Sequence, residues 1–336
     1  MCACVLSLEL TARAPPSLLP ARARRANFEP DVVFADPLNK FENLEAYLLN
    51  IAFLRVAFRP DFELHALAQT GPWEFQARWT MRLAMPSFGP MRSVWDPEVA
   101  FTGVSIYGIK PETGRVATHT DYWDSLPRDA QKFFSVQAAR DFLGMAGSLE
   151  RTPDLETPKY TLLKRAAEYE VRRYEPYEVA STPTGSGQLV GNAAAGMSFN
   201  ALAGYIFSEA KQDMTTPVFT SPEAAEGTTA GVEMQFVVED GTAEGGVAPS
   251  NPAVTTRRLD VGCVAARRFS GVVTDGDVAR ETKSLLAALD ADGVAHAPED
   301  KVFCAQYNEP STPGPARRNE VLVPLIGFSL PKKWVE

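Results

Sequence analysis

The chain has 336 residues and a formal net charge of −9; 45% of its residues are hydrophobic and 22% are charged. This composition is typical of a globular protein with room for two domains, and it excludes a wholly disordered chain. The negative charge, with no basic stripe of interleaved aromatic residues, argues against nucleic-acid binding. No apolar run of about eighteen residues occurs, so the sequence predicts no transmembrane segment.

Residues 1–27 differ from the rest of the chain. They carry four arginines and only one acidic residue, Glu9, and they are rich in alanine, leucine and serine. An arginine-rich, acid-poor N-terminus is typical of an organelle transit peptide. The alternative is a disordered start without a targeting role. The residues alone do not separate a plastid from a mitochondrial destination.

The first predicted domain spans residues 28–136. Apolar residues at helical spacing predict a helix over 41–58, and alternating apolar residues then predict strands over 74–83, 98–109 and 115–123. The segment 110–114 has the composition of a turn between the last two strands. A helix followed by antiparallel strands indicates an α+β domain.

Residues 137–159 are predicted to form a linker, and residues 160–334 a second domain. This domain shows a weak internal duplication, because each half has a strand, then a helix, then further strands. Two such halves can pair their strands into one barrel with the helices outside. The loop 240–255 is predicted to be flexible. The predicted helices are 194–210 and 276–290, and the predicted strands are 168–182, 216–220, 230–239, 257–274, 301–308 and 319–326.

Three side chains in the first domain are candidates for acid–base chemistry. His119, Asp121 and Trp123 alternate along one predicted strand, so they share a face. An imidazole and a carboxylate lining a pocket would act as general acid and base on a lipophilic ketone or ester. The alternative is a structural polar pair. Asp124 points to the other face and is expected to cap a turn.

Five short motifs in the second domain together resemble the SOUL haem-binding family, over about 175 residues. The resemblance implies a distorted eight-stranded β-barrel with two helices. It also implies a shallow apolar groove beside the first helix that takes haem or another porphyrin. The motifs are Tyr169–Pro176, Phe199–Ile206, Met214–Val218, Ala266–Gly271, and Tyr307–Pro310 followed by Arg317–Glu320.

The first domain resembles the SnoaL-like cone fold shared with nuclear transport factor proteins, a curved antiparallel sheet with helices. The pairing of such a domain with a SOUL domain is similar to an arrangement in photosynthetic organisms. It therefore favours the chloroplast as the destination, with mitochondrion or cytoplasm as alternatives. The residues that carry this resemblance are Asp36–Pro37, Arg78–Met81, Phe101–Ser105 and His119–Asp124.

A porphyrin groove needs apolar contacts for the ring and cations for its propionates. At each apolar position the alternative is packing in the core, because one face of the helix must cover the barrel. Arginines suit propionates geometrically, and Arg173 and Arg317 are the predicted cations, beside Arg172 and Arg318. The predicted apolar contacts are Phe199, Leu202, Ala203, Ile206 and Met214.

Axial ligation of haem iron is not evident in the sequence. Some SOUL proteins have a histidine in the first motif where this chain has Arg173, and the second domain's one histidine, His296, falls in a loop. Haem is therefore expected to bind without an axial histidine, or the ligand is an iron-free porphyrin. Met214, Cys263 and Cys304 are the remaining ligand candidates.

The sequence thus predicts a tetrapyrrole-binding carrier or buffer, with no catalytic residues and no metal site of its own. The alternatives are a SnoaL-like enzyme that uses the N-terminal pocket, or a scaffold that binds partner proteins. The N-terminal domain is also a possible site of homo-oligomer formation.

Overall fold

The computed structural model describes residues 25–84, 98–126, 136, 139–140, 152–185, 193–222 and 231–330. The chain divides into two compact units, and each is treated by itself. The first unit comprises 1–148, 163–167 and 330–336, and the second comprises 149–162 and 168–329. Most of the predicted transit peptide and much of the predicted linker lie outside the described residues.

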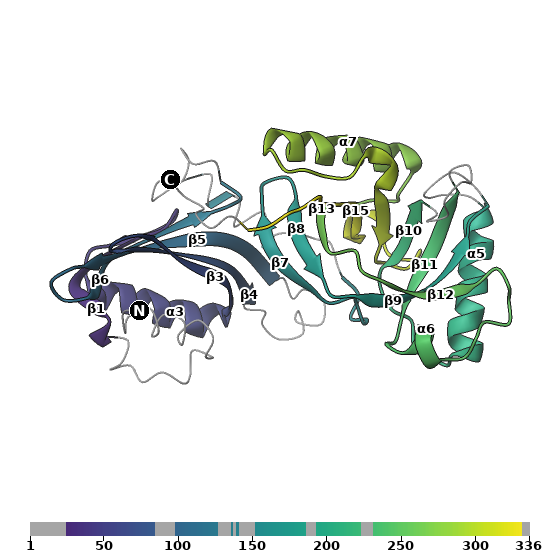
Figure 1. Ribbon diagram of the computed structural model, residues 1–336, viewed down its shortest axis with the longest axis horizontal. Helices are drawn as coiled ribbons and strands as arrows, with labels where there is room; N and C mark the ends of the chain where they lie inside the picture. Colours follow the sequence, from purple (N-terminus) through teal and green to yellow (C-terminus); the bar gives the residue numbers. More distant parts are fainter. Residues whose placement is uncertain are drawn as a thin grey trace. The chain divides into compact units, whose positions relative to one another are not determined.

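In its described residues, the N-terminal unit has a six-stranded curved sheet with the helix α3 on one face (Figure 1). The strand order is β2-β1-β6-β5-β4-β3; the sheet is antiparallel, as expected, apart from the parallel pairing of β1 with β6. The predicted helix and three predicted strands are confirmed, whereas β1 and β3 were missed. The elements are β1 Phe28–Ala35, β2 Lys40–Phe41, α3 Leu44–Phe58, β3 Asp61–Gly71, β4 Glu74–Ala84, β5 Glu98–Lys110 and β6 Arg115–Trp123.

Local chemistry sets the ends of α3 and its position on the sheet. The Asn43 side chain accepts a hydrogen bond from the Ala46 amide at 2.8 Å and so caps the first turn. The helix ends at Arg59, which has a left-handed backbone conformation (φ 42°). Tyr47 lies on the face toward the sheet and packs in the core with Phe34.

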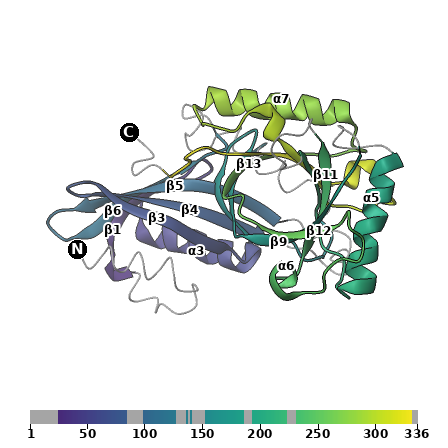
Figure 2. The same ribbon diagram turned by 45° about the vertical axis from the view of Figure 1, so that its right-hand side comes forward.

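The C-terminal unit is a nine-stranded curled sheet with helices outside it (Figure 2). The predicted barrel-type sheet and its two long helices are confirmed, and β7 adds a ninth strand at one edge. The strand order is β12-β9-β11-β10-β14-β15-β13-β8-β7. The strands are β7 Tyr160–Arg165, β8 Glu170–Tyr174, β9 Tyr177–Pro183, β10 Val218–Pro222, β11 Val232–Val238, β12 Thr255–Leu259, β13 Cys263–Phe269, β14 Phe303–Gln306 and β15 Asn319–Pro324.

The predicted duplication is visible in this strand order. One half runs β8-β9-α5-β10-β11 and the other runs β12-β13-α7-β14-β15. The halves meet where β10 pairs with β14. The first strand of each half also pairs with a strand of the other half: β8 of the first half pairs with β13, and β12 of the second half pairs with β9. Each predicted long strand is therefore two strands, separated at Glu175–Pro176 and at 260–262.

Two long helices cover the outside of this sheet. Helix α5 (Ala193–Gly204) continues as a π-helical turn, Tyr205–Glu209, and α7 spans Asp275–Ala291. Thr274 caps α7 and forms a capping box with Asp277. The remaining helical turns are α6 Thr242–Gly245, inside the predicted flexible loop, and the 3₁₀ turns Glu299–Lys301 and Gly314–Ala316.

The sheet of the C-terminal unit has apolar clusters on both of its faces. The inner cluster includes Phe219, Val264 and Leu322, and the cluster beneath α5 includes Leu202 and Phe236. Alternate residues of each strand thus pack on opposite sides. In the part of the chain that the structure describes, no helix has both the length and the apolar character needed to cross a membrane.

Candidate functional site

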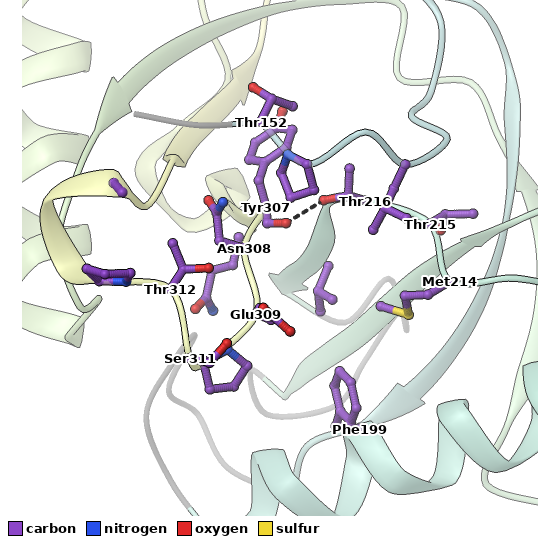
Figure 3. Close-up of a pocket in the computed structure, with 17 residues that line it drawn as sticks. Thr152, Phe199, Met214, Thr215, Thr216, Tyr307, Asn308, Glu309, Ser311 and Thr312 are labelled. Atoms are coloured by element: carbon purple, nitrogen blue, oxygen red, sulfur yellow. Dashed lines mark hydrogen bonds between the residues drawn. The ribbon is translucent and has the colours of Figure 1, made fainter. Parts of the chain in front are cut away.

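A pocket of about 810 Å³ lies in the C-terminal unit, where the two halves of the curled sheet meet (Figure 3). Small-molecule sites commonly have volumes of about 300–1,000 Å³. The described residues that line the pocket are Thr152, Pro153, Leu155, Phe199, Met214, Thr215, Thr216, Val218, Gln306, Tyr307, Asn308, Glu309, Pro310, Ser311, Thr312, Pro313 and Ala316.

One wall of the pocket is apolar. Phe199 projects from α5 and remains 39% exposed, although its ring packs edge-to-face on Phe236 with a centroid distance of 5.0 Å. Met214 lies on the segment between α5 and β10, and Val218 begins β10. Figure 3 shows Phe199 and Met214 on the same side of the pocket. An aromatic ring, a thioether and a branched side chain together offer a surface for a flat apolar molecule.

The opposite wall is the loop 308–313, and arginine side chains and backbone amides hold it in place. Arg317 Nε donates to the Thr312 carbonyl at 2.8 Å, and Arg317 Nη2 donates to the Pro310 carbonyl at 2.5 Å. The Asn308 side chain accepts from the Arg318 amide at 2.7 Å. These bonds hold the loop at Asn308, Pro310 and Thr312 through contacts within the protein itself.

The floor of the pocket is built from two buried threonines beside the paired strands β10 and β14. Thr216 Oγ1 donates to the Tyr307 carbonyl at 2.8 Å, and Thr215 Oγ1 donates to the Val237 carbonyl at 2.7 Å. Val218 and Gln306 are register partners across the two strands. The floor therefore joins the first half of the sheet to the second.

A buried charge cluster lies behind Tyr307. Tyr307 Oη donates to Glu320 at 2.8 Å, and Arg172 binds both Glu320 oxygens at 2.6 and 2.8 Å. Arg318 also binds Glu320, at 2.7 Å, and lies over the Tyr307 ring. Burial alone would raise the pKa of Glu320, but Arg172 and Arg318 overcome it and hold that pKa well below its usual value.

The structure brings two of the predicted contact residues, Phe199 and Met214, into the pocket lining. Leu202 and Ile206 are 0% and 1% exposed and pack in the core beneath α5. Ala203 is partly buried and packs against the same core.

The predicted cations lie outside the described lining. Arg317 holds the pocket loop through carbonyl groups. Arg173 is exposed on β8, where it pairs in register with Cys263. Prediction of the site missed the role of the loop 308–313, although the motif Tyr307–Pro310 marked its first residues.

The candidate axial ligands differ in their surroundings. Met214 lines the pocket. Cys304 is fully buried, and this burial, with the nearby charge of Glu320, raises the pKa of its thiol to about 12. His296 contacts the Ala297 carbonyl at 2.7 Å and Asp290 at 3.2 Å. Met214 is thus the candidate that already faces the pocket.

The N-terminal unit contains a separate chain of polar side chains. Tyr47 Oη lies 2.8 Å from His119 Nδ1, and His119 Nε2 lies 2.9 Å from Asp121 Oδ1. Ser105 donates to the same Asp121 oxygen and accepts from the indole of Trp79. His119 and Asp121 therefore lie together, as the strand alternation predicted.

Comparisons with known sequences separate the same two regions. The sequence model described as SOUL heme-binding protein matches residues 155–324, which is half of the chain. A model described as an uncharacterized conserved protein (DUF2358) matches residues 14–119. No curated protein sequence matches the chain.

Several solved structures are similar to part of the chain. A hydrolase from Listeria innocua has 9% identity over 47% of this chain and 92% of its own, with a TM-score of 0.35. A protein from Jannaschia sp. CCS1 described as a SnoaL-like polyketide cyclase has 14% identity over 36% and 85%, with a TM-score of 0.30. An NTF2-like protein of unknown function from Burkholderia pseudomallei K96243 has 12% identity over 42% and 98%, with a TM-score of 0.32.

Proposed function

The chain belongs to the SOUL heme-binding protein family, and we propose that its C-terminal unit binds haem or a related tetrapyrrole as a non-catalytic carrier or buffer. The observation that carries this proposal is the pocket between Phe199 and the loop 308–313. Its volume and its apolar wall suit a flat macrocycle with polar groups at the edge.

The residues present fit such a ligand. Phe199, Met214 and Val218 would contact the face of the ring, and the loop 308–313 would face its edge. Phe199 and several loop residues are exposed, so a ligand in the pocket would stay within reach of solvent and of an acceptor molecule. A partly open site suits release as well as capture, which is what a carrier or buffer requires.

Ligation of haem iron is a separate part of the proposal. Met214 is the described pocket residue with a sulfur atom, and a thioether is a known axial ligand of haem. We propose that apolar contact supplies most of the affinity and that no histidine ligand is needed. An iron-free porphyrin should then bind about as tightly as haemin.

A titration of the full chain with haemin and with iron-free protoporphyrin tests this proposal, followed by Soret absorbance and tryptophan quenching. Phe199→Asp should weaken both ligands at least about tenfold, because it removes an apolar contact and sets a carboxylate against the ring. Phe207→Asp is the matched control, since Phe207 is 52% exposed on the same helical segment and outside the described lining. His119→Ala should leave binding unchanged.

The outcomes divide clearly. Saturable binding of both ligands that Phe199→Asp weakens and Phe207→Asp does not would support the pocket. Binding of haemin alone would point to an axial ligand, and Met214→Leu would then test the thioether. Equal loss from Phe199→Asp and His119→Ala would move the site out of this pocket, and no binding at all would refute the function.

A second candidate function is an enzyme in the N-terminal unit, and the His119–Asp121 pair favours it. Asp121 Oδ1 takes hydrogen bonds from His119 and Ser105, which would fix the carboxylate as a general base. Burial and the charge of Asp121 also raise the pKa of Asp36 to about 6. The aromatic rings of Phe34, Tyr47 and Tyr107 pack around His119, which equally suits a structural role.

Hydrolysis of p-nitrophenyl butyrate by the full chain tests this candidate. In such a reaction Asp121 would accept a proton from water as the water oxygen bonds to the ester carbonyl carbon, and p-nitrophenolate would leave. Activity that Asp121→Asn removes and Phe199→Asp retains would support it. Activity that survives Asp121→Asn would place the reaction elsewhere.

We also propose that residues 1–27 direct the protein to the chloroplast. Their arginine-rich, acid-poor composition is typical of an organelle transit peptide, and the resemblance of the domain pairing to an arrangement in photosynthetic organisms favours the plastid. A fusion of these residues to a fluorescent protein should accumulate in plastids of plant cells. Accumulation in mitochondria or in the cytoplasm would refute this destination.

A further inference from the structure

A carboxylate lies at the rim of the proposed tetrapyrrole pocket, and its charge affects which tetrapyrrole the pocket prefers. We propose, resting on the function proposed above, that the pocket prefers a tetrapyrrole whose propionate groups are esterified over one with two free propionates. The acidic group is Glu309, which belongs to the loop 308–313.

The charges of the lining support this preference. Of the described residues that line the pocket, Glu309 is the one with an acidic side chain, and none is a lysine or an arginine. Glu309 is exposed at the rim, and Figure 3 shows its carboxylate between the loop and the wall formed by Phe199 and Met214. A free propionate near Glu309 would meet a like charge, whereas an ester would not.

The two arginines next to the loop have other partners. Arg317 donates through Nε and Nη2 to the carbonyl groups of Thr312 and Pro310. Arg318 donates to Glu320 and, at 2.7 Å, to Thr152 Oγ1. Arg318 is thus paired in the buried cluster, and Arg317 serves to hold the loop.

The neutral polar groups of the same wall suit an ester. Ser311 and Thr312 line the pocket and carry hydroxyl groups. A hydroxyl can donate a hydrogen bond to an ester carbonyl without the cost of stripping water from a charged group. The wall therefore offers hydrogen bonding to an uncharged ligand edge and repulsion to an anionic one.

The test compares iron-free protoporphyrin with its dimethyl ester on the full chain, in one buffer with the same low concentration of mild detergent. At an effective dielectric between those of a protein surface and water, one carboxylate several ångströms away changes affinity by about fivefold. The ester should therefore bind about fivefold more tightly. Glu309→Gln should tighten binding of the free acid by about the same factor and leave the ester unchanged.

Matched variants make the result specific. Glu299→Gln removes the same charge from an exposed residue outside the described lining and should leave both affinities unchanged. Added salt should tighten binding of the free acid to the wild type, because it screens repulsion, and should do nothing for Glu309→Gln.

Three results would overturn the preference. The first is tighter binding of the free acid than of the ester. The second is a ratio of the two dissociation constants that Glu309→Gln does not change. The third is a loss of affinity for the free acid, but not for the ester, in Arg317→Gln. The third result would place the propionates at Arg317. In each of these cases tetrapyrrole binding stands, whereas absence of binding by both probes would refute the proposed function together with the preference.

Discussion

Replacement of Glu320 by glutamine should strongly destabilise the C-terminal unit. Glu320 is 0% exposed and is bound by Arg172, Arg318 and the Tyr307 hydroxyl. Glutamine has nearly the same shape but no charge. It would therefore leave the Arg318 guanidinium without the carboxylate that it binds in this cluster, and it would leave Arg172, which is 2% exposed, with Glu170 as its remaining carboxylate partner.

The size of the effect follows from this geometry. Removing one partner of a buried ion pair costs about 3–5 kcal/mol, because the remaining charge stays out of water without compensation. For a domain of this size each 1 kcal/mol lowers the melting temperature by about 2–4 °C, so the expected fall is about 6–20 °C. The loss is larger than that expected for most single substitutions.

Thermal and urea unfolding at pH 7, followed by circular dichroism, measures the effect. Glu168→Gln is the matched control, because it removes the same charge from a side chain that is 60% exposed and pairs with Arg267. That control should cost at most about 1 kcal/mol. A Glu320→Gln variant that loses no more than the Glu168→Gln variant would refute the idea that this buried cluster stabilises the fold.

Three other predictions concern Glu320, Thr216 and Gly103. The arginines hold the pKa of Glu320 below its usual 4.5, so the stabilisation from the ionised carboxylate is complete above about pH 4.5 and is lost as the pH falls through the native pKa. The urea midpoint should therefore fall more steeply between pH 5 and 3 in the wild type than in Glu320→Gln. Thr216→Val removes the hydrogen bond to the Tyr307 carbonyl and should cost about 1–3 kcal/mol in urea unfolding, while Thr312→Val at the partly exposed loop should cost less. Gly103→Val should destabilise the N-terminal unit by about 1–3 kcal/mol, seen as an earlier loss of near-ultraviolet circular dichroism, because a Cβ at Gly103 would collide with the Tyr122 carbonyl oxygen and lie 2.7 Å from the Trp79 ring. Unchanged unfolding would contradict this clash.

Regular periodicity decided which elements could be predicted from the sequence. The helix α3 and the strands β4, β5 and β6 were predicted from the spacing of their apolar residues, and all four are confirmed. Strand β3 was missed, and its pairing with β4 shifts register at two places, between Leu64 and Ala66 and between Gln69 and Gly71. Such shifts break the alternation of inward and outward residues on which strand prediction depends.

The pocket could be predicted only in part, for a different reason. Phe199, Leu202 and Ile206 are all apolar and lie on neighbouring parts of one helix, so the sequence cannot tell which of them packs on the sheet and which faces a cavity. The loop 308–313 has no periodicity, and its place in the pocket depends on hydrogen bonds from Arg317 and Arg318. Those bonds leave no periodic signal in the sequence.

Because the two halves of the C-terminal unit exchange their first strands, we expect them to unfold together. With β8 bound to β13 and β12 bound to β9, neither half keeps its full set of strands if the other unfolds. The pocket lies on the seam, since Val218 of β10 and Gln306 of β14 pair beneath it. A ligand bound in the pocket would therefore contact both halves at once and stabilise them together. Ligand binding should then slow amide hydrogen exchange even in strands that do not contact the ligand.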